Sequence, residues 1–518
     1  MSLQDCRMSI LPHIPHHEVT PPRGLIARAE QLAEDLRTVD PSLRPSDAVT
    51  RLAVDQLEDG PTLHLDDQSS IALLDRIQSS VFQQDRARLR AGTGDFVASC
   101  AAPVASFETY CESRLNLGAV SWLHPQPLVN PMRVAAACWT DPRVRRTLVR
   151  ALRAGELRYL HPGMGSAMIW AVAELLQRAS GSKFSVIAPP PVLCARVNDK
   201  AWFADVVGRL FGPRAVPRTL QVSNFASLAF AVKSLLPGSH SLVVKIPDSA
   251  GGCGNLVLHP DEVASDTIGG IRRRLKERLA DLPWQPGERL LVGTWETCVL
   301  AAPSSQLWIP PEASGAPVVE GVFEQHCESA RGEFMGTRPA QLPGEVTAEL
   351  VERSWLLARL FQRLGYVGRC SFDAILVDDP SCDTGPSRLE FIECNGRWGG
   401  TSTPMNLVDR LLGGRRNTPY AAEKCSVPGL DCVQFSDVLD LFQDDLFDAR
   451  SGSGCLVFFG PNRLQATSSI DVIAFGESWA EVQRRARVEV PARLAALVSR
   501  TPASRTNDIR DDYHPGMQ

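Results

Sequence analysis

The segment Phe391-Ile392-Glu393-Cys394-Asn395-Gly396-Arg397 places a carboxylate, an amide and a guanidinium on alternate residues of a largely apolar run. Alternate residues of a β-strand share one face, so Glu393, Asn395 and Arg397 are predicted to point into one cleft. Two hard oxygen donors beside a guanidinium suit Mg²⁺ and a phosphate group. This segment alone leaves open the alternative of a polar strand face that meets solvent.

A glycine-rich segment follows a predicted buried strand that ends in a lysine. Val243-Val244-Lys245-Ile246 leads into Pro247-Asp248-Ser249-Ala250-Gly251-Gly252-Cys253-Gly254-Asn255. Glycine has no Cβ, so backbone N–H groups can approach an anion closely, and we expect a phosphate-binding loop. A tight β-hairpin is the alternative. The segment is not a Walker-type P-loop, because Lys245 precedes the glycines and the residues that follow are predicted to form a strand.

A single acidic residue interrupts another apolar strand, Arg369-Cys370-Ser371-Phe372-Asp373-Ala374-Ile375-Leu376-Val377. A carboxylate in a core strand is costly unless it is paired or bound to a metal ion. Asp373 is therefore predicted to need a cation, and a salt bridge to a neighbouring arginine is the alternative to a metal.

The composition describes a protein of several globular domains. With 518 residues, and about 100–200 residues per domain, three or four domains are expected. The net charge of -5 gives no reason to expect a nucleic-acid partner, and no apolar run has the length of a membrane span. The fourteen cysteines contain no CxxC pair, so neither a zinc site nor a disulfide framework is indicated, and a reducing cytoplasm fits best.

The order of predicted elements indicates an α/β fold. The first 95 or so residues are predicted to be helical, chiefly over 25–36 and 71–89, and Thr140-Asp141-Pro142 has the cap and first-turn proline of a further helix. Beyond it, strands and helices alternate, which predicts layers with mixed sheets. The predicted strands are 184–188, 242–246, 255–258, 370–377, 389–394, 455–459 and 470–474, with others near Leu290, Val299 and Val318; the predicted helices are 198–211, 261–279, 346–364 and 478–497.

The order of a lysine strand, a glycine loop, an aspartate strand and a Glu-x-Asn-x-Arg strand resembles the ATP-grasp superfamily of carboxylate-amine ligases. The resemblance covers about residues 187–411, and the most specific part is Glu393-Cys394-Asn395-Gly396-Arg397-Trp398-Gly399-Gly400. Within the superfamily the chain looks most like the pheganomycin-type peptide ligases. That finer likeness rests on Pro189-Pro190-Pro191 ahead of Asn198-Asp199-Lys200, Pro303-Ser304-Ser305-Gln306-Leu307 and Phe323-Glu324-Gln325.

The resemblance implies an α/β (α+β layers) ATP-grasp fold with a preceding Rossmann-like pre-ATP-grasp domain and a helical N-terminal extension. The implied domains are a helical N-terminal region at 1–95, a pre-ATP-grasp domain at 96–195, an ATP-grasp domain of two α/β lobes around the ATP cleft at 196–415, and a C-terminal α/β unit with a tail at 416–518.

The resemblance also implies roles for individual residues. Lys200 and Lys245 match the phosphate-binding lysines, and Arg397 matches the arginine that steadies the transferred phosphoryl group; Lys245 and Arg397 are the expected catalytic residues. The implied metal ligands are Asp373, Glu393 and Asn395, with Glu393 bridging two ions. The loop expected to cover the phosphates includes Asp248, Ser249, Gly251, Gly252 and Gly254.

The adenine hinge follows the family pattern less closely, and a further set of residues is a candidate for the substrate site. Family members place a glutamate directly after an apolar strand at the adenine hinge, whereas here Leu290-Leu291-Val292 leads to Gly293-Thr294-Trp295-Glu296, so Trp295 and Glu296 are expected to contact the nucleotide from a shifted position. The candidate substrate residues are Arg338, Arg369, Gly399, Gly400 and Thr401. A simple turn before a helix remains an alternative for the last three.

The implied reaction is ATP-dependent formation of an amide or peptide bond through an acyl phosphate, giving ADP and phosphate, in the biosynthesis of small-molecule or peptide natural products. The expected cofactors are ATP and Mg²⁺, with two ions and with Mn²⁺ as a substitute. The expected partners are small-molecule or peptide carboxylates and amines, with no nucleic acid and no membrane, and a homodimer is left open. The alternatives are transfer of the acyl phosphate to a thiol or other nucleophile, and a nucleotide-binding regulatory protein without turnover.

Overall fold

A computed structural model describes residues 17–71, 78–237, 241–247, 249, 254–263, 267–280, 284–328, 333–378, 387–413 and 418–501. Within these ranges the strands form three sheets, of which one is parallel and two are antiparallel. The predicted α/β fold class is thereby confirmed. In the same ranges, no helix combines the length and the apolar character needed to cross a bilayer.

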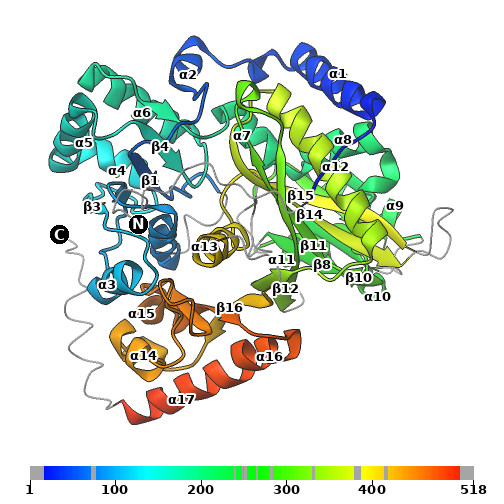
Figure 1. The fold of residues 1–518 in the computed structure, drawn as a ribbon. Coiled ribbons are helices and arrows are strands. Elements are labelled where there is room, and N and C mark those ends of the chain that lie inside the picture. Colours follow the sequence, from blue (N-terminus) through cyan, green and yellow to red (C-terminus); the bar gives the residue numbers. More distant parts are fainter. Residues whose placement is uncertain are drawn as a thin grey trace.

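The parallel sheet has the order β3-β2-β1-β4-β5. Its strands are β1 (Thr62–Leu65), β2 (Phe96–Ala98), β3 (Ser121–Leu123), β4 (Tyr159–Pro162) and β5 (Ser185–Val186). The helices that pack with this sheet are α2 (Asp47–Leu52), α4 (Val134–Thr140), α5 (Pro142–Ala154) and α6 (Ala167–Ser180), and Figure 1 shows α4, α5 and α6 together beside β4. Helix α3 (Ala105–Ser113) packs instead in the core of the C-terminal part. As predicted, Asp141 caps α5 and Pro142 opens it. The prediction that the first 95 residues are helical is wrong for the central strand β1.

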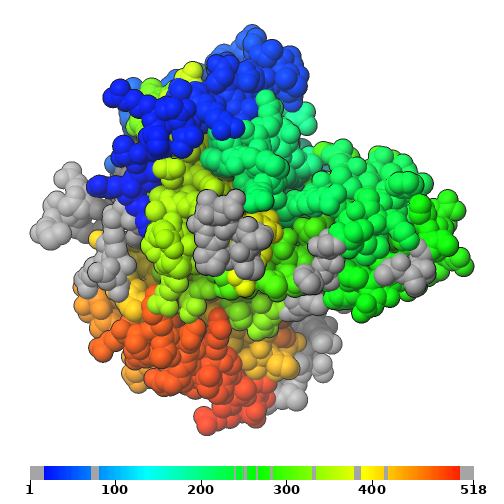
Figure 2. All heavy atoms as spheres, turned by 90° about the vertical axis from the view of Figure 1, so that its right-hand side faces the viewer, coloured from blue at the N-terminus to red at the C-terminus, as the bar shows by residue number. Residues whose placement is uncertain are grey.

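A smaller antiparallel sheet has the order β6-β9-β7-β8. Its strands are β6 (Thr219–Val222), β7 (Leu242–Lys245), β8 (Asn255–Leu258) and β9 (Leu290–Thr294), and its helices are α9 (Phe225–Leu235), α10 (Pro260–Val263) and α11 (Ile268–Arg278). The apolar residues of β7 and β9 pack with α9 and α11 in a core of their own. This small lobe projects from the rest of the molecule (Figure 2). The predicted single helix over 261–279 is wrong, because α10 and α11 are separate helices.

The large antiparallel sheet contains nine strands within the described ranges, in the order β10-β14-β11-β12-β13-β16-β18-β17, with β15 paired to β14. The strands are β10 (Val299–Ala301), β11 (Pro303–Ile309), β12 (Val318–Glu328), β13 (Glu333–Pro339), β14 (Gly368–Asp378), β15 (Ser387–Asn395), β16 (Tyr420–Ser426), β17 (Leu456–Phe459) and β18 (Ser469–Phe475). One core joins this sheet to α1 (Arg23–Val39), α7 (Pro191–Val197), α8 (Lys200–Phe211) and α12 (Gly344–Arg363).

The C-terminal strands extend the large sheet, and helices cover them (Figure 1). These helices are α13 (Ser402–Leu412), α14 (Phe435–Leu441), α15 (Arg463–Thr467), α16 (Trp479–Arg484), the π-helical turn η7 (Arg485–Glu489) and α17 (Val490–Arg500). Short 3₁₀ helices are η1 (Pro41–Leu43), η4 (Pro213–Ala215), η5 (Glu312–Ser314) and η6 (Leu430–Cys432). The predicted helix over 71–89 is wrong in type, since the structure has a 3₁₀ helix, η3 (Gln78–Arg90). The domain boundaries stay a prediction.

Candidate functional site

The β14–β15 hairpin places the predicted metal ligands opposite one another. Asp373 on β14 pairs in register with Glu393 on β15. Two residues along β15, the side-chain Nδ2 of Asn395 donates to Asp373 Oδ2 at 2.9 Å. Cys394, which lies between them, is buried in the core on the opposite face, as predicted. Glu393 and Asn395 therefore share the face that carries Asp373.

Lys200 connects the start of α8 to this face. Its Nζ lies 2.7 Å from Glu393 Oε2 and donates to the carbonyl oxygen of Ser249 at 2.6 Å. Its backbone N–H donates to the carbonyl oxygen of Pro247 at 3.2 Å. One lysine thus joins the segment after β7 in the small lobe to β15 in the large sheet.

The surroundings shift the pKa values of the two carboxyl groups of the hairpin, Asp373 and Glu393, in opposite directions. Burial, and then the negative charge of Glu393, raise the pKa of Asp373 to about 6. Burial also favours the neutral form of Glu393, but the charges of Lys200, Arg397 and Lys245 outweigh it and hold the pKa of Glu393 below its usual value. Glu393 is therefore the firmly ionised member, whereas Asp373 takes up a proton in mildly acidic solution.

The guanidinium of Arg397 is held from the junction of α7 and α8. The side-chain oxygen of Asn198 accepts hydrogen bonds from Arg397 Nη1 and, at 3.1 Å, from the N–H of Gly396. The backbone of Arg397 forms an antiparallel bridge with Met164, which follows β4. The end of β15 therefore lies between α8 and the parallel sheet, with Arg397 close enough to Glu393 to stabilise its charge.

Lys245 approaches the same place from the small lobe. It is the last residue of β7, it is half-buried, and its Nζ lies 5.9 Å from the centroid of the Trp295 ring. Burial, and then the positive charge of Lys200, lower the pKa of Lys245 to about 8, and Glu393 opposes this shift. Two mutually repelling lysines beside a carboxylate create a region that a polyanion would stabilise.

Within the predicted phosphate loop, Ser249 and Gly254 belong to the described residues. A Cβ on Gly254 would lie 2.4 Å from Ser249 Oγ, so glycine is required for this close approach. The Ser249 hydroxyl donates to the carbonyl oxygen of Ile246 at 2.9 Å, which turns it back toward its own strand. Asp248, Gly251 and Gly252 lie outside the described residues, and the phosphate contacts of the whole loop stay predictions.

The two residues predicted at the adenine hinge lie beside β7 and β15. The backbone N–H of Trp295 donates to the carbonyl oxygen of Ser241 at 2.9 Å, next to the start of β7. The carboxylate of Glu296 lies 3.3 Å from Arg388 Nη2 on β15. This places Glu296 at the junction of the two lobes, and its contact with a nucleotide stays a prediction.

The oxygens of Asp373, Glu393 and Asn395 fit a magnesium ion. Mg²⁺ prefers hard oxygen donors and is usually held by one or two carboxylates together with substrate phosphates. The hairpin face offers two carboxylates and an amide, with Lys200 and Lys245 beside them for phosphates. In the described parts of the chain, no three His, Cys, Asp or Glu side chains form a cluster that would hold a metal ion alone. The donor set therefore suits a metal ion shared with a phosphorylated substrate.

The predicted substrate residues Gly399 and Gly400 lie in the turn between the hairpin and α13, and Thr401 is the N-cap residue of this helix. The N–H of Gly399 donates to Ser402 Oγ at 3.2 Å, and a Cβ on Gly400 would lie 2.6 Å from the ring of Phe334. The hydroxyl of Thr403 is buried and has no hydrogen-bond partner among the described residues. Because helix N-termini favour anions, these groups fit a carboxylate, and their role as a substrate site stays a prediction.

The predicted substrate arginines both form ion pairs with glutamates. Arg369 forms an almost completely buried ion pair with Glu320, and its guanidinium lies 4.5 Å from the centroid of the Trp398 ring. Arg338 on β13 lies 2.6 Å from Glu324 on the neighbouring strand β12. These ion pairs give both arginines a structural role, while substrate binding by either one stays a prediction.

The structure adds three polar residues to the site. Asn198 positions Arg397, as described above, and Ser304 Oγ donates to Asp373 Oδ1 at 2.6 Å. Gln306 Nε2 in turn donates to Ser304 Oγ at 3.0 Å. The available signal in the sequence was that Ser304 and Gln306 stand two residues apart in Pro303-Ser304-Ser305-Gln306-Leu307, which places both on one face of a strand.

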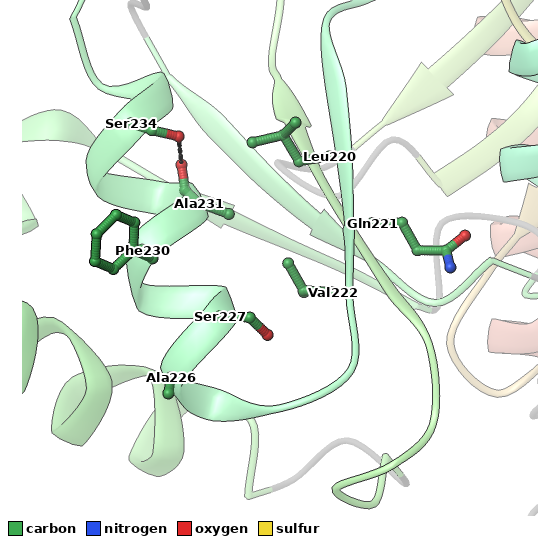
Figure 3. Close-up of a pocket in the computed structure, with 8 residues that line it drawn as sticks. All are labelled: Leu220, Gln221, Val222, Ala226, Ser227, Phe230, Ala231 and Ser234. Carbon is green, nitrogen blue, oxygen red and sulfur yellow. Dashed lines mark hydrogen bonds between the residues drawn. The ribbon is translucent and has the colours of Figure 1, made fainter.

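A groove of about 490 Å³ lies on the small lobe between β6 and α9, away from this chemistry (Figure 3). Apolar side chains dominate it, and Phe230 is 65% exposed at its edge. The groove contains no titratable side chain; its lining residues are Leu220, Gln221, Val222, Ala226, Ser227, Phe230, Ala231 and Ser234. It therefore offers no acid–base or metal-binding group.

Neither a protein-family model nor a curated protein matches this chain. Among solved structures, it is similar to N5-carboxyaminoimidazole synthetase from Staphylococcus aureus in complex with ADP, with 11% identity, a TM-score of 0.49, and coverage of 86% of this chain and 99% of that one. Biotin carboxylase from Campylobacter jejuni in complex with β,γ-ATP has 9% identity and a TM-score of 0.49, with coverage of 87% and 97%. The biotin carboxylase domain dimer of the Hydrogenobacter thermophilus 2-oxoglutarate carboxylase, with MgADP, ADP and bicarbonate, has 14% identity and a TM-score of 0.47, with coverage of 87% and 95%.

Proposed function

We propose that this protein is an ATP-dependent carboxylate-amine ligase of the ATP-grasp type, which forms an amide or peptide bond through an acyl phosphate and releases ADP and phosphate. The observation that carries the proposal is the convergence of two lobes on one charged site. Lys245 enters from the small lobe, Lys200 joins that lobe to Glu393, and Asp373 lies opposite Glu393 in the large sheet. Cations for phosphates therefore stand beside oxygen donors for Mg²⁺.

In the first step the chain positions charges and needs no covalent nucleophile. Lys200 and Lys245 attract the phosphates of ATP, and Arg397, held by Asn198, stabilises the transferred phosphoryl group. A bound Mg²⁺ would supply Lewis-acid stabilisation of the phosphate oxygens, held by Asp373, Glu393 and Asn395. The substrate carboxylate attacks the γ-phosphorus as the bond to the bridging oxygen breaks, which gives ADP and an acyl phosphate.

In the second step an amine attacks the acyl carbon, loses a proton and displaces phosphate. The α13 N-terminus is the proposed place for the substrates, because it follows Arg397 by a few residues and carries the buried Thr403 hydroxyl. Cys394 is buried on the opposite face of β15, which leaves it no role as a nucleophile there. The likeness to pheganomycin-type ligases makes a peptide or other natural product the proposed product class.

The test is release of ADP from a panel of carboxylates and amines, with mass analysis of the products. A ligase releases ADP only when both substrates are present and yields a product whose mass equals their sum minus water. ADP release that requires a thiol in place of the amine would replace the proposal with its thiol-transfer alternative. Tight ATP binding with no ADP release across the panel would contradict catalysis and favour a regulatory protein.

A further inference from the structure

Gln306 on β11 uses both ends of its side-chain amide in one chain of hydrogen bonds. Its Nε2 donates to Ser304 Oγ at 3.0 Å, and the Ser304 hydroxyl donates to Asp373 Oδ1 at 2.6 Å. Its Oε1 accepts from the Ser402 hydroxyl at 2.9 Å, and Ser402 Oγ accepts from the N–H of Gly399 at 3.2 Å. This chain of hydrogen bonds therefore runs from the backbone N–H of Gly399, before α13, to Asp373, a proposed metal ligand.

Strand geometry explains why Gln306 can join these two places. Ser304 and Gln306 are two residues apart, so both side chains lie on one face of β11. Ser304 stands directly opposite Asp373 in the register of β11 and β14. Ser402, the first residue of α13, reaches the same face from the helix.

Burial makes this chain of hydrogen bonds sensitive to the loss of any one of its side chains. Ser304 is fully buried, and Gln306 and Ser402 are each 1% exposed. A buried donor or acceptor that loses its partner keeps its full desolvation cost, because water cannot replace the partner. The hydroxyl of Ser304 donates its proton to Asp373, and that of Ser402 donates its proton to Gln306. Gln306 connects the two because its side-chain amide has both an acceptor for Ser402 and a donor for Ser304.

We infer that Gln306 is a positioning residue that couples the carboxylate of Asp373 to the turn at Gly399, where α13 begins. Through Gln306, a shift of this turn upon substrate binding moves Ser304 and thus the carboxylate. The effects on metal and substrate binding rest on the proposed function. The tether, which is the hydrogen-bonded connection from Gln306 through Ser402 to the N–H of Gly399, does not. Gln306 acts through other residues and touches neither the metal nor the substrate.

The test compares Gln306→Met, which keeps the length of the side chain and removes both hydrogen bonds, with Ser402→Ala, which breaks the chain only on the α13 side. Gln362→Met is the matched control. Gln362 is 3% exposed, and its Nε2 donates to the carbonyl oxygens of Pro310 at 2.9 Å and Gly315 at 2.7 Å, so this variant also loses a buried amide but in a different place.

The first measurement is hydrogen exchange of the backbone amides in the ligand-free protein. Gln306→Met and Ser402→Ala are expected to speed exchange at Gly399 about tenfold, as the loss of one hydrogen-bonded anchor allows local opening. Gln362→Met is expected to leave Gly399 unchanged. Equal exchange at Gly399 in Gln306→Met and in the unsubstituted protein would overturn the tether, whatever the enzyme activity.

The second measurement is the affinity for Mn²⁺ in the presence of ADP, followed by electron paramagnetic resonance. Gln306→Met is expected to weaken Mn²⁺ binding about tenfold, in the range found for partners of metal ligands, without changing the affinity for ADP alone. Combining Gln306→Met with Ser402→Ala is expected to add nothing further, because both act on one chain.

The outcomes separate the inference from the proposed function. Unchanged Mn²⁺ affinity in Gln306→Met, or strictly additive effects of the two substitutions, would overturn the coupling and leave the proposed function intact. An unsubstituted protein that binds neither Mn²⁺ nor ADP would overturn the proposed function together with the metal half of the inference. In that case faster exchange at Gly399 in Gln306→Met would still support the tether.

Discussion

Glu393 is the carboxylate around which the positive side chains of the site are arranged. Lys200 lies 2.7 Å away, and the charges of Arg397 and Lys245 also favour its ionised form. Three cations near one carboxylate leave a positive potential for phosphates. At the scale of single residues, the negative charge of Glu393 therefore organises the cations of the site as much as the shape of its side chain does.

Glu393→Gln is expected to lower the rate of ADP release about 100-fold or more, since the amide keeps the shape but loses the charge that pairs with Lys200 and that is proposed to hold the metal ion. Arg397→Ala should have a similar effect by removing the guanidinium that Asn198 positions. Steady-state kinetics measure both, and thermal unfolding checks that each variant folds. The exposed Glu345→Gln serves as control. Near-normal turnover in either site variant would contradict the assignment.

Lys245 is expected to make nucleotide binding depend on pH. The pKa of Lys245 is lowered to about 8, so the ammonium is charged below that pH and neutral above it. Affinity for ADP is therefore full at lower pH and falls as the pH rises through about 8. Bound phosphate stabilises the ammonium and so raises the pKa of Lys245 in the complex. Calorimetric titration should show this fall, and Lys245→Arg should abolish it because arginine stays charged.

Lys245→Ala is expected to weaken ADP binding about 10- to 100-fold at neutral pH, which corresponds to one charge-assisted hydrogen bond. The exposed Lys183→Ala is the control for loss of a positive charge elsewhere. Unchanged affinity in Lys245→Ala would remove this lysine from the phosphate site.

At the scale of elements, the cap of α5 allows a direct stability test. Asp141 Oδ1 accepts from the N–H groups of Arg143 at 2.8 Å and Val144 at 3.2 Å. Asp141→Ala is expected to reduce the free energy of unfolding by about 1–2 kcal/mol, while Asp141→Asn, which still caps, should lose less. Urea unfolding measures both. Equal losses in the two variants would show that capping is not the source of the stability.

The sequence was most informative where one periodicity dominates. β8 was predicted with its observed ends as an apolar run after the glycine-rich segment. β14 and β15 were predicted to within two residues, because polar residues alternate with apolar ones along part of each strand. β1 was missed although Thr62-Leu63-His64-Leu65 alternates polar and apolar residues, because four residues are too few for a period to stand out. The helical pattern of η3 does not distinguish a 3₁₀ from an α-helix, and its Arg88 and Arg90 pair with residues distant in sequence.

The residues of the candidate site also fall into those that the sequence predicts and those that it does not. Residues expected to touch phosphate or metal stand out in the sequence, since a charged side chain in an apolar strand requires an explanation. Asn198, Ser304 and Gln306 contact side chains that lie more than 50 residues away in the sequence. Ser304 donates to Asp373, whereas Asn198 accepts from Arg397 and Gln306 accepts from Ser402. Only the folded structure reveals such partners.

At the scale of the whole molecule, the three sheets meet around the end of β15. The small lobe is joined through Lys200, and Trp398 receives the guanidinium of Arg369 at 4.5 Å and that of Arg90 at 4.7 Å from its ring centroid. The indole N–H of Trp398 also donates to His161 Nε2 at 3.2 Å, at the end of β4. A ligand bound at this meeting point therefore stabilises all three parts together.

MgADP at 100 times its dissociation constant is expected to raise the free energy of unfolding by about 2.7 kcal/mol, provided that the unfolded chain does not bind it. Thermal unfolding with ADP alone, with Mg²⁺ alone and with both measures the effect. Glu393→Gln should lose the part that depends on Mg²⁺. Unfolding temperatures that do not respond to MgADP in the unsubstituted protein would contradict a nucleotide site between the lobes.

The segment that carries Arg397, directly after β15, pairs with the loop that follows β4. Arg397 pairs with Met164 through its backbone, and the N–H of Trp398 donates to the carbonyl oxygen of Gly163 at 2.8 Å. A shortened gene that encodes only the small lobe and the large sheet would leave these backbone groups of Arg397 and Trp398 without their partners. Chimaeric proteins that exchange the N-terminal portion between related chains must therefore keep the backbone path of residues 163–164, even where the side chains differ.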